Sequence, residues 1–331
     1  MGNGVVIFTA VILSVTGVAN VLSLAFLLSR KKLRTQSNFY ISSLILADLS
    51  LTSSMTLHYI DSAGFYTGLY TTEVGCSFLT YFELSFLAAS TANIILISLD
   101  VRKAVMNAAT YTQNPKEAIR RLVFAWLLSF IYGTRIFAQF AVTDSLQGAT
   151  SEEDSSAENS TKIIVNDEEQ SLKFCNLISE EETSDIYFRV VDLVCLFIAP
   201  IVVLFLIGYQ ILKYINDKTL NTDGRKDRKR RIQLRSVIGI AAFFICWSPF
   251  YLMDIITDAK EIIEGADDDD DDGVDVTTDS TRVAINFLAN LHCFINLVIY
   301  AWLNKNFREQ IAVVVTKCRG NQQNQVHIAP Q

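Results

Sequence analysis

Several signatures of catalysis and transport are missing from this chain. It contains no HExxH, GxSxG or P-loop sequence, and its three histidines, His58, His292 and His327, are too dispersed for a convincing metal triad. No internal repeat of the kind found in secondary transporters is visible. The last long apolar stretch, residues 283–303, has no lysine that could hold retinal. These absences argue against an enzyme, a transporter and a retinal-based pump.

Charge is nearly absent from seven long stretches of the chain. Its 28 basic and 35 acidic side chains fall in blocks, and long apolar stretches separate the blocks. A helix needs about 20 apolar residues to span a hydrocarbon core. Seven stretches reach that length: 4–29, 38–60, 74–100, 119–141, 186–214, 233–257 and 283–303. None alternates with period two, and lipid offers no partner for open backbone groups. The sequence therefore predicts an all-α membrane protein, a seven-transmembrane-helix bundle.

The loops alternate in charge, which predicts the orientation of the bundle. The first, third and fifth loops are basic, as in Arg30–Arg34 and Arg225–Arg231, whereas the other three are acidic, as in Asp267–Asp272. We expect a multi-pass plasma-membrane protein with its N-terminus outside and its C-terminus in the cytoplasm. The first stretch lacks a basic segment before it, so an uncleaved helix is favoured over a signal peptide.

Two cysteines and one asparagine fit this sidedness. Cys76 heads the third stretch and Cys175 lies in the long fourth loop, so a disulfide on the oxidising side is reasonable. Asn159 opens a glycosylation sequon in the same loop. Cys318 follows the last stretch on the inner side and is either a palmitoylation site or a free thiol. The other cysteines lie within apolar spans and need no further explanation: Cys195, Cys246 and Cys293.

Polar side chains inside the apolar spans are candidates for function, because each costs roughly 2.5–3.5 kcal/mol on insertion scales when ionisable and central. Four stretches contribute five of them: Asn20, Asp48, Ser90, His292 and Asn296. A carboxylate with amide, hydroxyl and imidazole partners predicts an internal polar cluster. Its role is either ion-linked or bistable switching, or simply hydrogen bonding between helices.

An ordered set of motifs resembles that of the rhodopsin-like G-protein-coupled receptors. The matching segments are Gly17–Asn20, the second-helix motif Leu44–Asp48, Trp126, Phe243 with Cys246–Pro249 (CWxP), Asn296–Tyr300 (NPxxY) and the Cys76–Cys175 pair. Phe307 and Arg308 resemble the start of a short amphipathic eighth helix. The set covers all seven stretches in order. Pro200 and Pro249, which remove helical hydrogen bonds, are possible hinges.

The resemblance implies a cell-surface receptor that binds an extracellular ligand and signals through a heterotrimeric G protein or arrestin. Trp247 and Phe243 would relay ligand binding, and Tyr300 would repack on activation. The receptor domain would cover 1–303, with acidic outer loops at 142–185 and 258–282 and a basic inner loop at 215–232; an amphipathic helix and cytoplasmic tail would follow at 304–331.

The resemblance also implies a sodium ion, bound by Asp48, Ser90 and Asn296 in the inactive state. No other cofactor and no nucleic acid is expected, and the partners would be the ligand, the signalling proteins and membrane lipid. The basic loop Arg225–Arg231 could touch anionic lipid or a G protein, although the inner location alone explains its charge equally well.

The inner end departs from the family pattern. Where the family has Asp-Arg-Tyr, this chain has Asp100, Val101 and Arg102. One residue turns a helix by about 100°, so Val101 takes the arginine position and Arg102 is expected to face the headgroups. Further departures are Leu297 in place of proline, His292 in place of a small polar residue or asparagine, and Tyr209, displaced by one residue. Weak, biased or absent G-protein coupling is therefore an alternative.

Three carboxylates are expected at the outer end of the bundle. Glu83 lies seven residues after Cys76, where amine receptors of the family carry an aspartate, and Asp192 and Asp254 have pocket-facing positions on two other helices. Together they predict a cationic ligand (a polyamine, an amine or a basic peptide), and three acids suit one with more than one positive centre. The acidic outer loops would attract it, unless they are merely solvated.

Other residues complete or oppose this pocket. Trp247 would belong to it, and Asn286 and Asn290 would lie on its seventh-helix face. Amine receptors usually present aromatic side chains there, so these asparagines argue against a simple monoamine. The alternative is that Arg135 and Arg189, near the same boundary, neutralise some of the acids and leave no cationic site.

Overall fold

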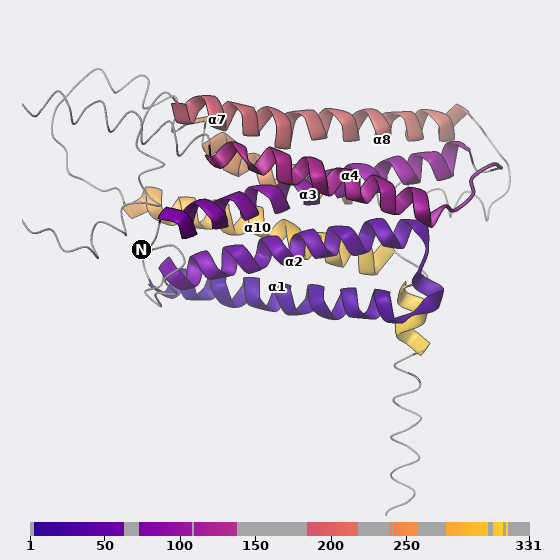
Figure 1. The fold of residues 1–331 in the computed structure, drawn as a ribbon, viewed down its shortest axis with the longest axis horizontal. Helices are drawn as coiled ribbons and strands as arrows, with labels where there is room; N and C mark the ends of the chain where they lie inside the picture. The colour runs from indigo at the N-terminus through magenta and orange to yellow at the C-terminus, as the bar shows by residue number, and fades with distance from the viewer. Residues whose placement is uncertain are drawn as a thin grey trace, which may run out of the picture.

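The structure is a computed structural model, and it describes residues 3–62, 73–107, 109–137, 184–217, 238–239, 241–253, 255–256, 276–303, 307–313 and 316. Long helices lie side by side across this described part, which contains no strand (Figure 1). They are α1 (Asn3–Ser29), α2 (Gln36–Ser62), α3 (Glu73–Met106), α4 (Pro115–Gly133), α7 (Ser184–Asp192), α8 (Ala199–Asp217), the helical segment Ala241–Met253 and α10 (Val276–Leu303). The predicted helical bundle is confirmed.

The start of α4 shows how local sequence sets a helix boundary. Pro115 occupies the first turn, where its missing N–H costs nothing, and the Asn114 side chain accepts a hydrogen bond from the Glu117 backbone N–H. The helix therefore begins four residues before the apolar stretch predicted at 119–141, and the described helix ends at Gly133.

The surface of the bundle is apolar and its interior holds polar groups. Leu22 and Phe205 are 65% and 68% exposed, whereas Asn20, Asp48 and Ser90 are fully buried. Among the described helices, Ile7–Ser29, Val74–Met106 and Tyr187–Tyr214 are each long and apolar enough to cross a membrane. An apolar exterior of this kind is stable when the solvent is lipid.

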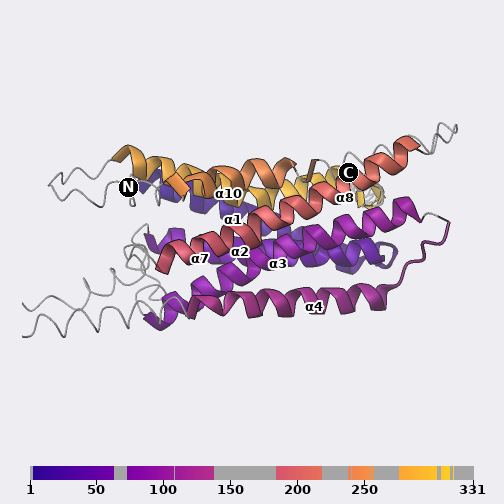
Figure 2. The ribbon, with the colours of Figure 1, turned by 90° about the horizontal axis from the view of Figure 1, so that it is seen from above.

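The helices pack in an order that places α2 and α3 at the centre. α2 contacts α1, α3, α4 and α10, and α3 also contacts α4 and α8 (Figures 1 and 2). The largest cluster of buried apolar residues lies among α2, α3, the π-helical turn before α8, α8, Ala241–Met253 and α10; it includes Leu44, Ile94, Phe197, Phe243 and Trp247. This cluster lies beside the polar core described below.

The helix formed by α7 and α8 contains a wide turn. Residues Leu193–Ile198 form a π-helix, in which the Ala199 N–H donates to the Val194 carbonyl. Pro200 follows directly and cannot donate to the carbonyl four residues earlier. The extra residue in the turn accommodates this missing hydrogen bond and changes which faces of α7 and α8 point inward.

The predicted eighth helix is described from Phe307 to Val313, and it is bent away from α10. Phe307 is buried, with its ring 5.1 Å from that of Tyr300 and 5.2 Å from that of Phe26. These aromatic contacts attach the short helix to the end of the bundle.

Close packing of α3 against α4 makes Gly133 sensitive to substitution. A Cβ atom at Gly133 would lie 2.0 Å from Ser85 Oγ and 3.1 Å from the Tyr81 ring. Ser85 Oγ is held by a hydrogen bond to the Tyr81 carbonyl. We predict that Gly133→Ala destabilises the detergent-solubilised protein by about 1–3 kcal/mol, as overpacking does. Thermal unfolding of the purified chain is the measurement.

Gly17→Ala is the matched control, because a Cβ atom there would meet only Leu49 Cδ1 at 3.9 Å. Helix propensity then favours alanine by up to about 1 kcal/mol. Equal melting temperatures for the two variants would show that α3 and α4 do not approach each other this closely.

Candidate functional site

A buried carboxylate lies at the centre of the polar residues that the sequence indicated. Asp48, on α2, accepts hydrogen bonds from Ser90 Oγ of α3 at 2.6 Å and from Asn296 Nδ2 of α10 at 3.0 Å. Asn296 Nδ2 also lies 2.9 Å from Nε2 of His292. The structure thus brings together four of the five polar residues singled out in the spans: Ser90 and Asn296 bond to the acid, and His292 contacts Asn296.

Asn20 is the member of the set that does not join the group. Its Nδ2 donates to the Thr16 carbonyl one turn earlier in α1 at 3.0 Å, and its buried Oδ1 has no hydrogen-bond partner among the described residues. Burial without full pairing is costly. Among the described residues, Asn20 is therefore buried in the bundle and hydrogen-bonded to its own helix alone.

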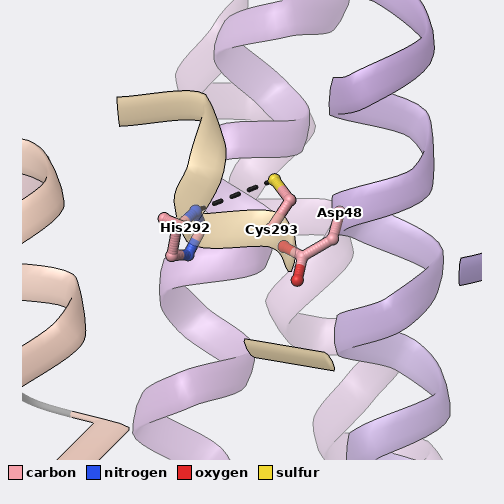
Figure 3. A group of neighbouring side chains, drawn as sticks. All are labelled: Asp48, His292 and Cys293. Atoms are coloured by element: carbon pink, nitrogen blue, oxygen red, sulfur yellow. Dashed lines mark hydrogen bonds between the residues drawn. The ribbon is translucent and has the colours of Figure 1, made fainter. Parts of the chain in front are cut away.

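Cys293 belongs to this core, although it was not among the polar residues predicted from the spans. Its Sγ lies 3.7 Å from Nδ1 of His292, and ligating atoms of Asp48, His292 and Cys293 all lie within 4.8 Å of one another (Figure 3). All three side chains are buried. The position of Cys293 beside His292 in the same span could have indicated a role in the core. A cysteine in an apolar span is equally explained by packing alone.

The fit of a sodium ion to this group is partial. Asp48 and Ser90 offer oxygen atoms, but Asn296 presents its Nδ2 to the carboxylate, and the next neighbours offer nitrogen and sulfur. Sodium, like other hard cations, prefers oxygen ligands. Sodium binding by Asp48, Ser90 and Asn296 stays a prediction.

A small cavity extends from the carboxylate toward the predicted inner end. It has a volume of about 60 Å³, and its lining includes Asp48, Asn296, Val101 and Tyr300. A water molecule needs roughly 10–15 Å³ of such space, so the cavity can hold water. Val101 therefore faces the bundle interior, as its position in the third stretch predicted.

Aromatic rings connect the polar core to the outer half of the bundle. The His292 ring meets the rings of Phe243 and Trp247 at 5.9 Å in each case, close to edge-on. Trp247 in turn contacts Phe250 and Tyr251 at 5.8 and 6.1 Å. Edge-to-face contacts at these distances are favourable. The relay residues predicted from the resemblance thus lie against His292.

Asp192 is paired, which corrects the prediction that it offers its carboxylate to a ligand. Arg135 forms an ion pair with Asp192, and the Tyr132 hydroxyl donates to the same carboxylate. The arginine also lies over the Tyr132 and Phe188 rings, with its Cζ 5.7 and 5.5 Å from their centroids. For this acid the neutralised alternative holds, because the carboxylate already has a cation beside it.

The other predicted pocket residues are only partly described. Glu83 is half-buried on α3, Asn290 is buried on α10, and Asn286 belongs to α10 with its side chain outside the described set. Cys76 is disulfide-bonded. The following predicted sites lie outside the described residues: Asp254, Cys175, Asn159 and Cys318.

At the inner end, Asp100 is held by neutral groups that the sequence did not indicate. It accepts hydrogen bonds from Gln36 Nε2 at 2.8 Å, Ser37 Oγ at 2.6 Å and the Tyr111 hydroxyl at 2.9 Å. Gln36 Oε1 also accepts from the Asn114 backbone N–H at 2.6 Å. This network joins the beginnings of α2 and α4 to the end of α3.

The displaced motif residues have different surroundings. Val101 packs with Val105 and with Ile207 of α8, whereas Arg102 is half-buried and its buried Nε has no hydrogen-bond partner among the described residues. Arg102 therefore does not project wholly into the headgroups as expected. Tyr209 is 55% exposed on α8, which agrees with its displacement by one residue from the family position, and its part in activation stays a prediction.

The seventh-helix motif is continuous in the structure. α10 runs unbroken through Leu297, because leucine keeps the backbone hydrogen bond that proline would remove. Leu297 is buried in a cluster with Leu27, Ile41 and Phe307. Tyr300 donates from its hydroxyl to Asn38 Oδ1 at 3.3 Å.

Comparison with known proteins gives one family. Residues 19–300 match the model described as 7 transmembrane receptor (rhodopsin family). Trace amine-associated receptor 7a of Rattus norvegicus is 26% identical over 319 residues, covering 92% of this chain and 79% of the relative. Histamine H2 receptor of Homo sapiens is 23% identical over 317 residues, covering 92% of this chain and 77% of the relative.

Tyr111 gives a test of the inner-end network. Burial and then the nearby Asp100 carboxylate raise the pKa of Tyr111 to about 12. Its stabilising contribution is therefore present below pH 10 and is lost as the pH rises toward 12. We predict that Tyr111→Phe lowers the free energy of unfolding by about 1.5 kcal/mol at pH 7. The variant should also lose less stability than the wild type between pH 10 and 12.

Tyr187→Phe is the control, because Tyr187 is exposed on α7 at the other end of the bundle. The measurement is thermal unfolding of the purified chain across this pH range. If the two variants behave alike, Tyr111 does not bind Asp100 in the folded protein.

Proposed function

The chain belongs to the seven-transmembrane receptors of the rhodopsin family, which are not enzymes, and we propose that it binds a small protonated amine at the outer end of its bundle. The single observation that carries this proposal is the position of Glu83 on the inward stripe of α3. The names of the matched relatives, which refer to trace amines and histamine, support the same class of ligand.

The orientation of Glu83 follows from its helical neighbours. Leu87, four residues on, packs against the cluster that contains Trp247, and Ser90, seven residues on, bonds to Asp48. Residues spaced by four and seven share one face of a helix. Glu83 therefore lies one turn outward of Leu87 on the face that points into the bundle, where its carboxylate can meet a ligand cation.

Aromatic side chains supply the second part of the proposed pocket. Trp247, Phe250 and Tyr251 contact one another on Ala241–Met253, and the Phe197 ring lies 4.8 Å from that of Tyr251. The faces of such rings attract ammonium groups by about 0.5–2 kcal/mol. A carboxylate and aromatic rings in the same half of the bundle suit a compact ammonium ligand.

The ion pair at Asp192 favours an amine with one positive charge. Because Arg135 already neutralises Asp192, that carboxylate cannot add a second counter-ion without breaking the pair. A polyamine or a basic peptide would need at least two such groups. A small amine needs only Glu83.

The receptor is proposed to sit in the plasma membrane with the Glu83 end outside. Basic residues such as Arg30 and Lys31 lie at the opposite end of the bundle, beside the start of α2, which fits an inner face. A G protein, arrestin and anionic lipid are the proposed partners of that face.

Glu83→Gln tests the amine site. A charge-assisted hydrogen bond contributes about 1.5–3 kcal/mol, so we expect the potency of tyramine, phenylethylamine or histamine, whichever activates the wild type, to fall roughly 10- to 150-fold. The readout is ligand-stimulated signalling in cells together with competition binding to membranes.

Glu117→Gln is the matched control, since it makes the same change in the ion pair with Arg121 near the start of α4. The potency of the amine at this variant should match its potency at the wild type after correction for surface expression. If amine potency is unchanged in Glu83→Gln, Glu83 does not bind the amine and the proposed site is wrong.

A second candidate function is ligand binding with weak or biased G-protein coupling. Two observations favour it: Val101 occupies the inward position at the end of α3, and neutral donors from Gln36, Ser37 and Tyr111 satisfy Asp100. A G protein docking at this face would meet no inward arginine at the family's position.

Restoring the family order tests this alternative. We expect the double variant Val101→Arg, Arg102→Tyr to raise basal or ligand-stimulated nucleotide exchange on co-expressed G proteins, because an arginine at 101 would reach the inner cavity. Arrestin recruitment is measured in parallel. If wild type already matches a strongly coupled amine receptor in exchange rate, the weak-coupling alternative is wrong.

A further inference from the structure

The group of Asp48, His292 and Cys293 contains the donor atoms of a transition-metal site. We propose that these three side chains bind a zinc-like divalent ion, which bridges α2 and α10 in the middle of the bundle. The inference is independent of the amine site and of any signalling output. It departs from the sodium prediction because two of the three donors are nitrogen and sulfur.

The spacing of the donors fits zinc. Zinc bonds are about 2.3 Å to sulfur and 2.0–2.1 Å to nitrogen, which places sulfur and nitrogen about 3.6 Å apart at a tetrahedral angle. Cys293 Sγ and His292 Nδ1 are 3.7 Å apart. The candidate donor atoms all lie within 4.8 Å of one another, so the widest pair needs to close by at most about 1.4 Å.

The surroundings offer candidates for the outer partner and the fourth ligand of such a site. Asp48 extends from α2 toward His292 and Cys293, which are adjacent on α10 (Figure 3). Asn296 lies 2.9 Å from Nε2 of His292, and its amide must present Oδ1 there to accept the Nε2 proton when Nδ1 ligates the ion. The cavity that borders Asp48, whose lining does not include His292 or Cys293, is large enough to supply a water molecule from the carboxylate side.

Charge balance favours a divalent ion with this donor set. When the ion binds, bonds form to a carboxylate oxygen of Asp48, a ring nitrogen of His292 and the sulfur of Cys293, and the thiol proton passes to solvent. One carboxylate and one thiolate then offset the two positive charges of zinc. A neutral site of this kind avoids leaving a net charge inside the membrane. Binding should weaken as the pH falls, because protons compete for the thiolate.

The test uses the purified full-length chain in detergent, stripped of metal with a chelator. We expect one equivalent of Zn²⁺ to raise its melting temperature, whereas Mg²⁺ does not. Co²⁺ should give the charge-transfer absorption of a thiolate–cobalt bond, and Zn²⁺ should abolish that absorption by displacement. These readouts need no variant and no known agonist. Absence of both the stabilisation and the absorption in the wild type would overturn the proposal.

Variants identify the ligands. Cys293→Ser should eliminate the cobalt–thiolate band, and His292→Asn should weaken Zn²⁺ binding by more than the roughly 10- to 100-fold typical of losing an outer partner. Cys195→Ser is the matched control, because it removes an exposed thiol in the π-helical turn before α8. Retention of the band in Cys293→Ser, or its loss in Cys195→Ser, would place the metal elsewhere and refute the site.

Sodium is tested in the same melting experiment. If Na⁺ stabilises the wild type, Cys293→Ser and His292→Asn equally while Zn²⁺ has no effect, the core is a site for a hard monovalent cation and the zinc proposal is wrong. If Zn²⁺ stabilises only chains with both His292 and Cys293, the assignment stands.

Discussion

One buried carboxylate determines how the central helices must meet. Asp48 lies inside a bundle whose outer surface is apolar, so lipid and bulk water are both unable to satisfy it. Its hydrogen bonds come from Ser90 on α3 and Asn296 on α10. A one-residue shift of either helix would turn its donor about 100° away and take one of these two hydrogen bonds from the acid. The register of three helices thus depends on one side chain.

The family membership and the helical bundle could be predicted from the sequence because both depend on local patterns. The length of each apolar stretch predicts a span. A polar residue in the middle of a span predicts a position in the core, even when its hydrogen-bond partner is unknown. Helical periodicity also placed Val101 inward. The partners of Asp100 could not be predicted, because Gln36 is 64 residues away in sequence and Tyr111 approaches through the turn before α4. Those contacts depend on tertiary packing.

Other errors came from properties that the sequence does not display. An acidic side chain near the outer boundary predicts a cation beside it, but that cation need not belong to a ligand. For Asp192 it is the Arg135 side chain. The π-helical turn at Leu193–Ile198 adds a residue to the helix. Cys293 was overlooked because a thiol counts as apolar in hydropathy, although its sulfur lies beside His292.

The position of His292 connects the polar core to the outer pocket. Its ring touches Phe243 and Trp247, and Trp247 touches the aromatic rings on which the proposed amine site depends. A ligand that moves Trp247 must therefore change the packing of His292. An ion bound to His292 would in turn hold that ring in one orientation and restrict Trp247. Because coupling between two binding sites is reciprocal, the factor by which such an ion changes amine affinity equals the factor by which the amine changes affinity for the ion.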